Sequence, residues 1–463
     1  MPDRQLIIAA NRLPVRNVPH GEGRRWVTSP GGLVSALAPV MDGRRAIWVG
    51  WSGAAGRHIA PFEHDGLHLH PIELSRAEIQ QYYEGFSNAT LWPLYHDVIG
   101  QPEYHRTWWD AYVKVNRRFA DAIVSIADPD ATVWIHDYQL QLVPGMLRQI
   151  LPDVRIGFFF HTPFPAREIF LRLPWRTQVM RALLAADLIG FQTEVMAHNF
   201  RHTVPRVVPD AEHHGESENV ILGGHTTRTR TRPIGIDYDR FATAAISPDT
   251  AERVEALRAT LGHPRKVLLG VDRLDYTKGI DVRLRAFGEL LDEDRISADD
   301  VVMIQVAEPS RSNVNGYAEV RAEVERQVGE INGSHGTMER PAIHYLHRSH
   351  DFAELMALYR LADVMVVTPF RDGMNLVVKE YVATRHEFTG AVVLSEFAGA
   401  AHELSQAVLV NPYDIDGLKE ALEWAVVMPP EDQRIRMTSM REAVAANSAQ
   451  HWAASFIAEI EEP

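Results

Sequence analysis

The chain has 463 residues, of which 46% are hydrophobic and 23% are charged, and its formal net charge is −14. This composition is typical of a soluble globular protein, and the length predicts two domains of roughly two hundred residues each. The acidic balance argues against a nucleic-acid or anionic-membrane surface. The absence of cysteine excludes disulfides, thiolate catalysis and cysteine-bound zinc.

The start of the chain lacks the basic residues and the long apolar segment of a signal peptide, and no apolar run approaches the length of a membrane span. We therefore expect a cytoplasmic protein with no nucleic-acid and no membrane partner. A homo-oligomer is compatible with the sequence, which does not predict the oligomeric state.

The first expected strand, residues 6–10, is followed at once by Asn11-Arg12. An arginine at the carboxyl end of a first strand lies where open α/β sheets bind ligands, although a solvated loop arginine is the more common explanation. A Gly31-Gly32 pair then opens a helix and could let the backbone approach a phosphate. A second strand is expected over residues 46–50.

Residues 75–115 are unusually rich in aromatic side chains. Such a stripe is more often core than binding surface, yet Tyr and Trp also bind sugar rings through an apolar body and a polar tip. Tyr83 and Trp92 fall in the less regular part of this segment. We favour them as ligand contacts over Trp108 and Trp109, which have helical spacing.

Polar side chains end two further strands of the first half. One apolar run ends at His136-Asp137, and the next ends at His161. A crossover helix between them makes the strands parallel, so their carboxyl ends meet at one edge of the sheet. We expect Asp137 and His161 to bind a ligand there and His136 to be structural.

The alternation of strands and helices restarts near residue 240. Repeated βα units on both sides of this boundary predict an α/β protein with two doubly wound, Rossmann-like domains that face a cleft. We place the first domain at 1–238, the second at 239–445, and a C-terminal helix at 446–463 that crosses back to the first. Strands of the second domain are expected at 266–271, 301–306, 344–346, 364–367 and near 392.

Two loops of the second half carry positive charge after a strand. Arg273 and Lys278 lie five residues apart in one loop, and Arg311 ends the other. Cations at the carboxyl ends of strands are placed to bind phosphate oxygens. These loops supply the local basic cluster that an acidic enzyme with phosphorylated substrates would need.

The segment 364–383 reads as a strand, a tight loop at Asp372-Gly373 and a helix from about Asn375. Backbone N–H groups and the positive end of the helix dipole favour an anion above such a loop. The carboxylates of Asp372 and Glu380 could hold sugar hydroxyls, so a sugar nucleotide fits. An ordinary βα unit with a capping Asp and a solvated Glu fits equally well.

Other common site motifs are absent from the sequence. It contains neither a Gly-x-Gly-x-x-Gly dinucleotide motif, nor a P-loop, nor a Gly-x-Ser-x-Gly elbow. His344, His347 and His350 resemble a metal triad, but strand and loop geometry would scatter them, and we predict no metal and no cofactor.

Taken together, ten motifs between residue 11 and Asp414 resemble the retaining trehalose-6-phosphate synthases of glycosyltransferase family 20, which have the GT-B fold. Each motif alone is weak, but they occur in order along nearly the whole chain. They are Asn11-Arg12, Pro30–Leu33, Leu91–Pro93, Trp134–Tyr138, Phe159–Pro165, Gly190–Thr193, Asp272–Gly279, Pro309–Arg311, Arg371–Leu376 and Glu396–Ala400.

The resemblance implies transfer of glucose from a nucleoside-diphosphate glucose to glucose 6-phosphate with retention, through a front-side mechanism without a metal. It implies that Arg273, Lys278, Asp372 and His161 are catalytic. The acceptor would be bound by Arg12, Tyr83, Trp92, Asp137 and Arg311, and the donor by Gly32, Arg273, Lys278, Asp372, Gly373, Met374, Asn375, Leu376 and Glu380.

The donor base and the acceptor remain open at this stage. UDP-glucose is the default for the family, but Glu308 could accept hydrogen bonds from the N1–H and N2–H of guanine, which makes GDP-glucose a serious alternative; an inert loop residue is the simpler explanation. A related transferase with another phosphorylated acceptor and an inactive sugar-phosphate sensor are the competing functions.

Overall fold

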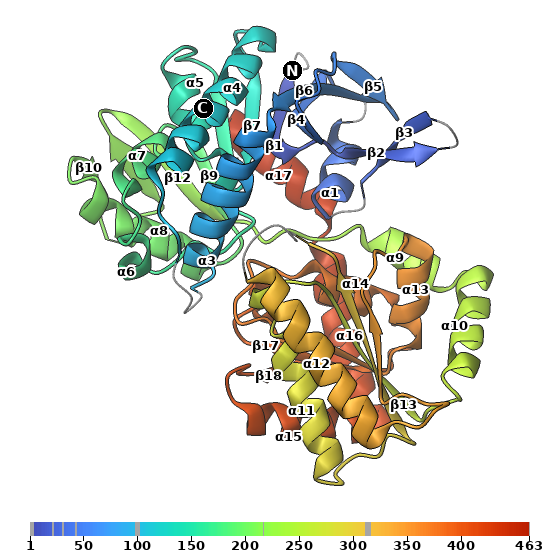
Figure 1. Cartoon of the computed structure of the whole chain (residues 1–463). Coiled ribbons are helices and arrows are strands. Elements are labelled where there is room, and N and C mark those ends of the chain that lie inside the picture. Colours follow the sequence, from blue (N-terminus) through green and yellow to red (C-terminus); the bar gives the residue numbers. More distant parts are fainter. Residues whose placement is uncertain are drawn as a thin grey trace. The chain divides into compact units, whose positions relative to one another are not determined.

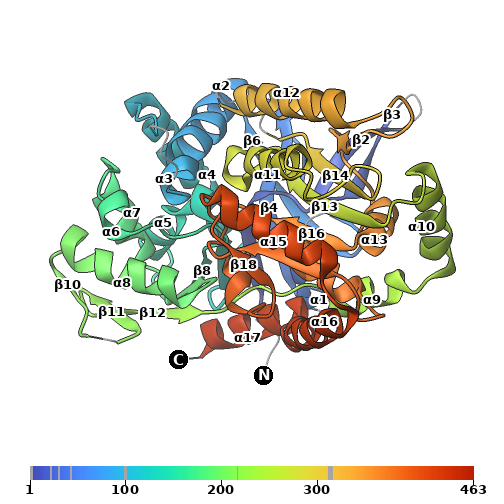
Figure 2. The ribbon, with the colours of Figure 1, turned by 90° about the horizontal axis from the view of Figure 1, so that it is seen from below.

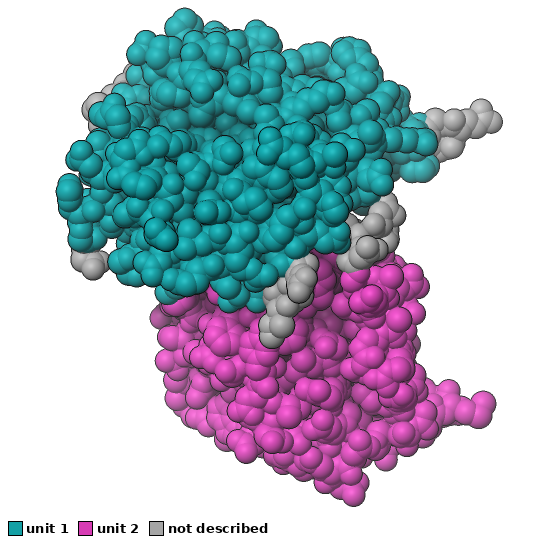
Figure 3. Space-filling model, turned by 60° about the vertical axis from the view of Figure 1, so that its left-hand side comes forward, with its two compact units in different colours: residues 1–234, 449–463 teal, residues 235–448 magenta. Residues whose placement is uncertain are grey.

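The computed structural model of the protein describes residues 4–20, 23–29, 32–41, 44–97, 102–215, 217–310 and 316–462. The chain divides into two compact units, which are coloured separately in Figure 3. Unit 1 comprises residues 1–234 and 449–463, and unit 2 comprises residues 235–448.

Unit 1 is built on a ten-stranded sheet in the order β10-β11-β12-β9-β8-β7-β1-β4-β6-β5. The strands from β12 to β6 are parallel, whereas β10, β11 and β5 pair antiparallel with their neighbours. A separate hairpin joins β2 to β3. The strands are β1 (Leu6–Arg12), β2 (Val15–His20), β3 (Gly23–Thr28), β4 (Ala46–Ala55), β5 (Phe62–His64), β6 (Leu67–Leu74), β7 (Thr132–His136), β8 (Arg155–Phe159), β9 (Leu188–Phe191), β10 (Ala211–Glu212), β11 (Asn219–Leu222) and β12 (His225–Thr231).

The strands of unit 1 form where short apolar runs allow burial on both faces, as expected of a parallel sheet. Six of the seven residues of β1 are buried, and all of β7 is buried. Helices cover the sheet (Figure 1). They are α1 (Gly32–Met41), α2 (Arg76–Glu78), the π-helix η1 (Ile79–Leu91), α3 (Trp92–Tyr95), α4 (Arg106–Ile126), the 3₁₀ turn η2 (Tyr138–Leu140), α5 (Val143–Arg148), α6 (Arg167–Phe170), α7 (Arg176–Leu183), α8 (Glu194–Val207) and α17 (Ala449–Glu461).

The C-terminal helix α17 packs on unit 1, beside α1 and against β7, β8 and β9 (Figure 2). Trp452 and Phe456 lie with their ring centroids 5.1 and 4.9 Å from that of Trp134. Glu459 Oε1 accepts a hydrogen bond of 2.6 Å from Arg230, and Oε2 accepts one of 2.9 Å from Arg232. Aromatic burial and a paired carboxylate thus join the end of the chain to its first half.

Unit 2 has a six-stranded parallel sheet in the order β15-β14-β13-β16-β17-β18. In Figure 1, α11, α12 and α15 lie on one face, and α13, α14 and α16 lie on the other. This arrangement confirms the predicted α/β class with doubly wound parallel sheets.

The strands of unit 2 are β13 (Lys266–Arg273), β14 (Val301–Glu308), β15 (Ile343–Leu346), β16 (Val364–Val367), β17 (Ala391–Ser395) and β18 (Val408–Val410). Its helices are α9 (Tyr238–Ala245), α10 (Pro248–Thr260), η3 (Tyr276–Lys278), α11 (Ile280–Asp292), α12 (Tyr317–His335), α13 (Phe352–Leu361), α14 (Leu376–Thr384), η4 (Gly399–His402), α15 (Ile415–Val427) and α16 (Pro430–Ala446). No helix in the part of the chain that the structure describes is long and apolar enough to cross a membrane.

The packing of α17 predicts a large effect of Trp452→Ala on unit 1. Trp452 is 2% exposed, and removal of a buried Trp side chain typically costs about 3–5 kcal/mol. We expect the free energy of unfolding, measured with denaturant and followed by fluorescence, to fall by that amount. Trp424→Ala on α15 is the matched control, because this Trp is 36% exposed and its loss should cost far less. Equal losses for the two variants would contradict the packing role of α17.

Candidate active site in each unit

Arg12, the last residue of β1, meets two aromatic side chains of unit 1. Its guanidinium carbon lies 4.5 Å from the ring centroid of Trp51, and the ring of Tyr83 lies 5.6 Å from the same Trp ring in an edge geometry. Trp51 belongs to β4, next to β1 in the sheet. The structure therefore places two predicted acceptor residues, Arg12 and Tyr83, on a shared aromatic support.

Tyr83 and Trp92 lie in helical structure, so our assignment of them to an irregular segment was wrong. Tyr83 belongs to the 13-residue π-helix η1, and Trp92 begins α3. π-helical turns are rare and occur often at functional sites. Trp92 is only 5% exposed, and its ring lies 3.9 Å from that of His96. Its packing role is evident, and its contact with an acceptor remains a prediction.

Asp137 follows β7 with φ of 71°, a conformation that residues other than glycine rarely adopt. Its Oδ1 accepts hydrogen bonds from the backbone N–H of His161 at 3.2 Å and from both the N–H and hydroxyl of Thr162 at 3.1 and 3.0 Å. These bonds join the ends of β7 and β8. Burial nevertheless raises the pKa of the Asp137 carboxyl to about 6.

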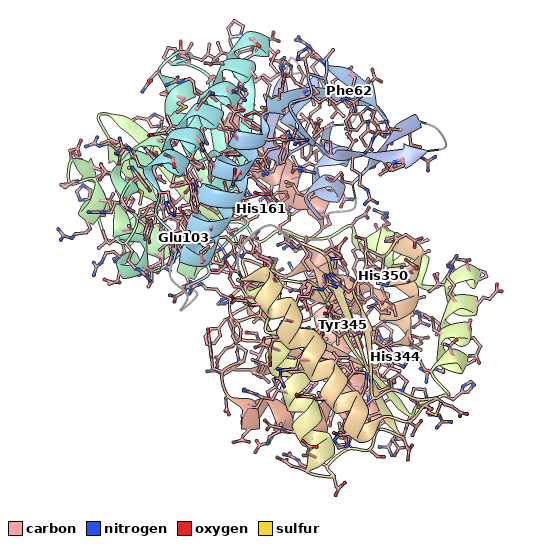
Figure 4. The ribbon with its side chains drawn as sticks, in the orientation of Figure 1. Phe62, Glu103, His161, His344, Tyr345 and His350 are labelled. Atoms are coloured by element: carbon pink, nitrogen blue, oxygen red, sulfur yellow. The ribbon has the colours of Figure 1, made fainter. Side chains whose placement is uncertain are left out.

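His161, labelled in Figure 4, lies two residues after the end of β8. Its ring contacts that of His136. The His136 Nδ1 and His161 Nε2 atoms are 3.1 Å apart, and burial lowers the pKa of His161 to about 3. Asp137 and His161 thus meet at one sheet edge, as their strand positions predicted. Gly32, another predicted residue of this unit, opens α1. Arg311, which was also predicted to bind the acceptor, lies outside the described residues.

In unit 2, the loop after β13 meets the loop before α14. Lys278 Nζ donates a hydrogen bond of 2.6 Å to Asp372 Oδ2, and the Asn375 side-chain amide donates one of 3.2 Å to the same oxygen. Asn375 has φ of 79°, and its side-chain oxygen caps α14 by accepting from the N–H of Val378. A cation, a carboxylate and a capped helix N-terminus therefore converge in this unit.

Arg283 on α11 forms hydrogen bonds that fix the loop containing Lys278. This arginine is fully buried, and it donates hydrogen bonds to the Lys278 carbonyl at 2.6 Å, to Asp272 Oδ2 at 2.7 Å and to the Thr368 hydroxyl at 3.1 Å. Its partners come from β13, from the loop after it and from the end of β16. The position of the Lys278 backbone is thus fixed by a buried ionic network.

The other predicted donor residues occupy the same loops and strand ends. Arg273 and Glu308 are the last residues of the neighbouring strands β13 and β14, in register with each other. Glu380 on α14 accepts a hydrogen bond of 2.8 Å from the Tyr359 hydroxyl, and burial raises its pKa. Between Asp372 and α14, the loop comprises Gly373, the buried Met374 and Asn375, and Leu376 is the first residue of the helix.

The three histidines near β15 are scattered, as expected. His347 Nδ1 lies 2.9 Å from the Ala307 carbonyl oxygen, and both ring nitrogens of His350 are buried with no hydrogen-bond partner. His344 is the second residue of β15, whereas His347 and His350 follow this strand (Figure 4). Across the described ranges, no three His, Asp or Glu side chains are grouped so as to hold a metal ion.

Sequence reasoning missed Trp51 and Arg283. Trp51 directly follows the expected strand 46–50, as Arg12 follows the expected strand 6–10, although in the structure Trp51 lies within β4 (Ala46–Ala55). Arg283 has no such signal, since an arginine within a helix usually faces solvent. Only the packing of α11 on the sheet reveals that this side chain is buried.

Comparison with known proteins identifies the family to which the chain belongs. The family model for glycosyltransferase family 20 matches residues 4–462. A trehalose-6-phosphate synthase of Mycolicibacterium smegmatis is 52% identical over 460 residues, which cover 98% of this chain and 91% of that protein.

Solved structures show the same fold over the whole chain. A Burkholderia xenovorans α,α-trehalose-phosphate synthase (UDP-forming), in complex with glucose-6-phosphate, has a TM-score of 0.90 and 34% identity, with 99% of this chain and 100% of that chain covered. An E. coli structure described as trehalose-6-phosphate bound with UDP-2-fluoro glucose has a TM-score of 0.91 and 33% identity, with 99% of each chain covered. This chain shares their GT-B fold, and it belongs to glycosyltransferase family 20.

Proposed function

We propose that this retaining glycosyltransferase is an α,α-trehalose-6-phosphate synthase, which transfers glucose from a nucleoside-diphosphate glucose to glucose 6-phosphate. The observation that carries the proposal is the 52% identity over 98% of the chain to a relative of that name. In the described part of the chain, unit 1 contains the residues that the resemblance assigns to the acceptor, and unit 2 contains most of those that it assigns to the donor. A purified-protein assay with glucose 6-phosphate, in which the disaccharide product is identified, tests the proposal directly.

The acceptor is assigned to unit 1. A guanidinium at Arg12 suits a phosphate, and the Trp51 and Tyr83 rings beside it suit the apolar face of a sugar. Asp137 is assigned to acceptor hydroxyls. Another phosphorylated acceptor would use Arg12 equally well, so the aromatic pair is the feature that favours a sugar ring.

The donor diphosphate is assigned to Arg273, Lys278 and the N-terminus of α14. Negative charge grows on the leaving diphosphate as the glycosidic bond breaks, and fixed cations and helix N–H groups stabilise that charge. Asp372 is ion-paired with Lys278 at 2.6 Å, which makes it a poor nucleophile. This pairing supports a front-side mechanism, in which the departing phosphate accepts the proton of the acceptor hydroxyl.

The nucleotide base of the donor, uracil or guanine, is assigned separately. We take UDP-glucose as the default, because relatives are named UDP-forming. Glu308 favours GDP-glucose as an alternative: it ends β14, and His350 has two buried ring nitrogens that lack a hydrogen-bond partner among the described residues. Guanine offers N1–H and N2–H donors for a carboxylate and an O6 acceptor for a histidine N–H. Uracil offers a single N–H between two carbonyl oxygens.

Lys278→Met should lower kcat by about 10²–10³, because it removes one fixed cation from the developing charge. The KM for glucose 6-phosphate should change little. Lys266→Met is the matched control, since Lys266 begins β13, the strand that precedes the Lys278 loop, and pairs with Asp363 at the opposite end of the sheet. Steady-state kinetics with both substrates measure the effect, and an unchanged kcat in Lys278→Met would refute the catalytic assignment.

The pKa of about 6 at Asp137 predicts a pH dependence of acceptor use. Below pH 6 the carboxyl is protonated in the folded protein, and above it the carboxylate can accept hydrogen bonds from acceptor hydroxyls. We expect kcat/KM for glucose 6-phosphate to rise as the pH increases through about 6.

Glucose 6-phosphate itself also titrates near pH 6, because the second pKa of a phosphate monoester is about 6. Asp137→Asn separates the two contributions, since an amide cannot ionise. The inflection that disappears in this variant belongs to Asp137. An unchanged pH profile would assign the inflection to the substrate alone.

The donor base is decided by comparing kcat/KM for UDP-glucose and GDP-glucose. If Glu308 binds guanine, Glu308→Gln should lower kcat/KM for GDP-glucose by about tenfold and leave UDP-glucose nearly unchanged, since a hydrogen bond to a charged group contributes about 1.5–3 kcal/mol. Glu339→Gln, on an exposed residue of the same unit, is the control. Retention of full GDP-glucose turnover in Glu308→Gln would eliminate the guanine contact.

A further inference from the structure

The histidine pair at the ends of β7 and β8 contains one ring that the proposed reaction does not use. His136 is 1% exposed, and its ring stacks on that of His161 with a centroid separation of 5.3 Å and an interplanar angle of 26°. The His136 Nδ1 and His161 Nε2 atoms lie 3.1 Å apart, within hydrogen-bond distance. His136 Nε2 is buried and has no hydrogen-bond partner in the part of the chain that the structure describes.

Both imidazoles are neutral near pH 7. Burial, followed by the neighbouring His161, lowers the pKa of His136 well below its ordinary value. Burial alone lowers the pKa of His161 to about 3. A neutral imidazole has one N–H and one lone pair, so a single proton lies between the two rings. That proton is on either His136 Nδ1 or His161 Nε2.

The unpartnered nitrogen decides between these two arrangements. If His161 donated, the proton of His136 would be on Nε2, leaving a buried N–H without an acceptor. If His136 donates, its buried Nε2 carries only a lone pair. Orphaned buried N–H groups are rarer than under-satisfied acceptors, which favours donation by His136.

Trp134 supports the same choice from the neighbouring position on the strand face. Its ring centroid lies 4.6 Å from that of His136, and its Nε1–H, a donor that cannot accept, is also buried without a hydrogen-bond partner among the described residues. An N–H at His136 Nε2 would add a second unsatisfied donor to this face of the strand, whereas a lone pair there would not.

We propose that His136 is a positioning residue that holds His161 in the Nδ1–H tautomer, so that His161 presents a hydrogen-bond donor on its other side. His161 is only partly buried, and its Nδ1 is neither buried nor bonded within the described residues. The rings of Phe159 and Trp452 pack against the His161 ring, with centroid distances of 4.8 and 5.9 Å, and limit rotation of the imidazole.

The consequence for catalysis rests on the proposed function. An Nδ1–H at His161 can donate to a hydroxyl oxygen of the donor glucose but cannot act as a general base. The acceptor proton would then have to leave by another route, which agrees with transfer to the departing phosphate. The tautomer itself does not depend on the reaction and can be measured separately.

The first test is nitrogen NMR of the full-length protein labelled with ¹⁵N-histidine. The His161 ring signals are identified by their loss in His161→Asn, and two-bond proton–nitrogen couplings report which nitrogen carries the proton. We expect the proton on Nδ1 of His161 and on Nδ1 of His136 in the native protein. A proton on Nε2 of His161 would overturn the proposal, whatever the enzymatic activity.

The second test uses three substitutions of His136. His136→Asn places an amide N–H near the Nδ1 position, His136→Gln places it near the Nε2 position, and His136→Phe keeps a ring but no nitrogen. We expect kcat/KM for the sugar-nucleotide donor to fall about tenfold in the Gln and Phe variants and by less than about threefold in the Asn variant, the range of one neutral hydrogen bond. The KM for glucose 6-phosphate should be unchanged.

The outcomes separate this proposal from the proposed function. Equal loss in the Asn and Phe variants would mean that His136 acts only through packing and would overturn the positioning role. Absence of transfer in the native protein with every nucleoside-diphosphate glucose would reject the function, while the NMR measurement would still decide the tautomer. If a variant fails to fold, the native spectrum alone decides.

Discussion

The buried charge of Arg283 is the constraint on which the geometry of unit 2 depends. A guanidinium without solvent must have its donors satisfied, since an unpaired buried charge costs several kcal/mol. Arg283 meets this requirement by donating to Asp272, to Thr368 and to the carbonyls of Val366 and Lys278. The groups that satisfy the charge are thus the strand ends and the loop that present Lys278. The same hydrogen bonds therefore stabilise the core and fix the backbone of Lys278, the cation that we propose to act on the donor.

In unit 1, a buried carboxylate, that of Asp137, likewise connects neighbouring strand ends. Asp137 collects N–H and hydroxyl donors from the residues after β8, which links two adjacent parallel strands beyond their last ladder bonds. Burial still raises the pKa of Asp137, because the hydrogen bonds offset only part of the cost of removing its charge from water. Perturbed groups of this kind cluster at functional sites because function requires them to remain available to a ligand.

The fold was predictable where the sequence signal is local. Runs such as that of β1 are buried on both faces, and their apolar character alone predicts parallel strands. It also predicts the carboxyl edge of each sheet, where Asp137 and His161 lie in unit 1 and Lys278 and Asp372 lie in unit 2. The π-helix that carries Tyr83 was not predictable, because its wider turn depends on packing and not on a residue pattern. The support of Arg12 by Trp51 likewise arises from strand pairing between distant segments.

Two of the seven non-glycine residues with positive φ in the described part of the chain lie in these loops. Asp137 and Asn375 both have positive φ, although neither is glycine, and such conformations cost about 1–3 kcal/mol each. In each case a side chain at the strained position bonds to the next element: Asp137 to the end of β8, and Asn375 to the first turn of α14. Glycine would adopt either conformation without strain but could make neither bond. The strain is therefore the cost of placing a polar side chain where the backbone must also turn, and the sequence alone contains the residue but not the angle.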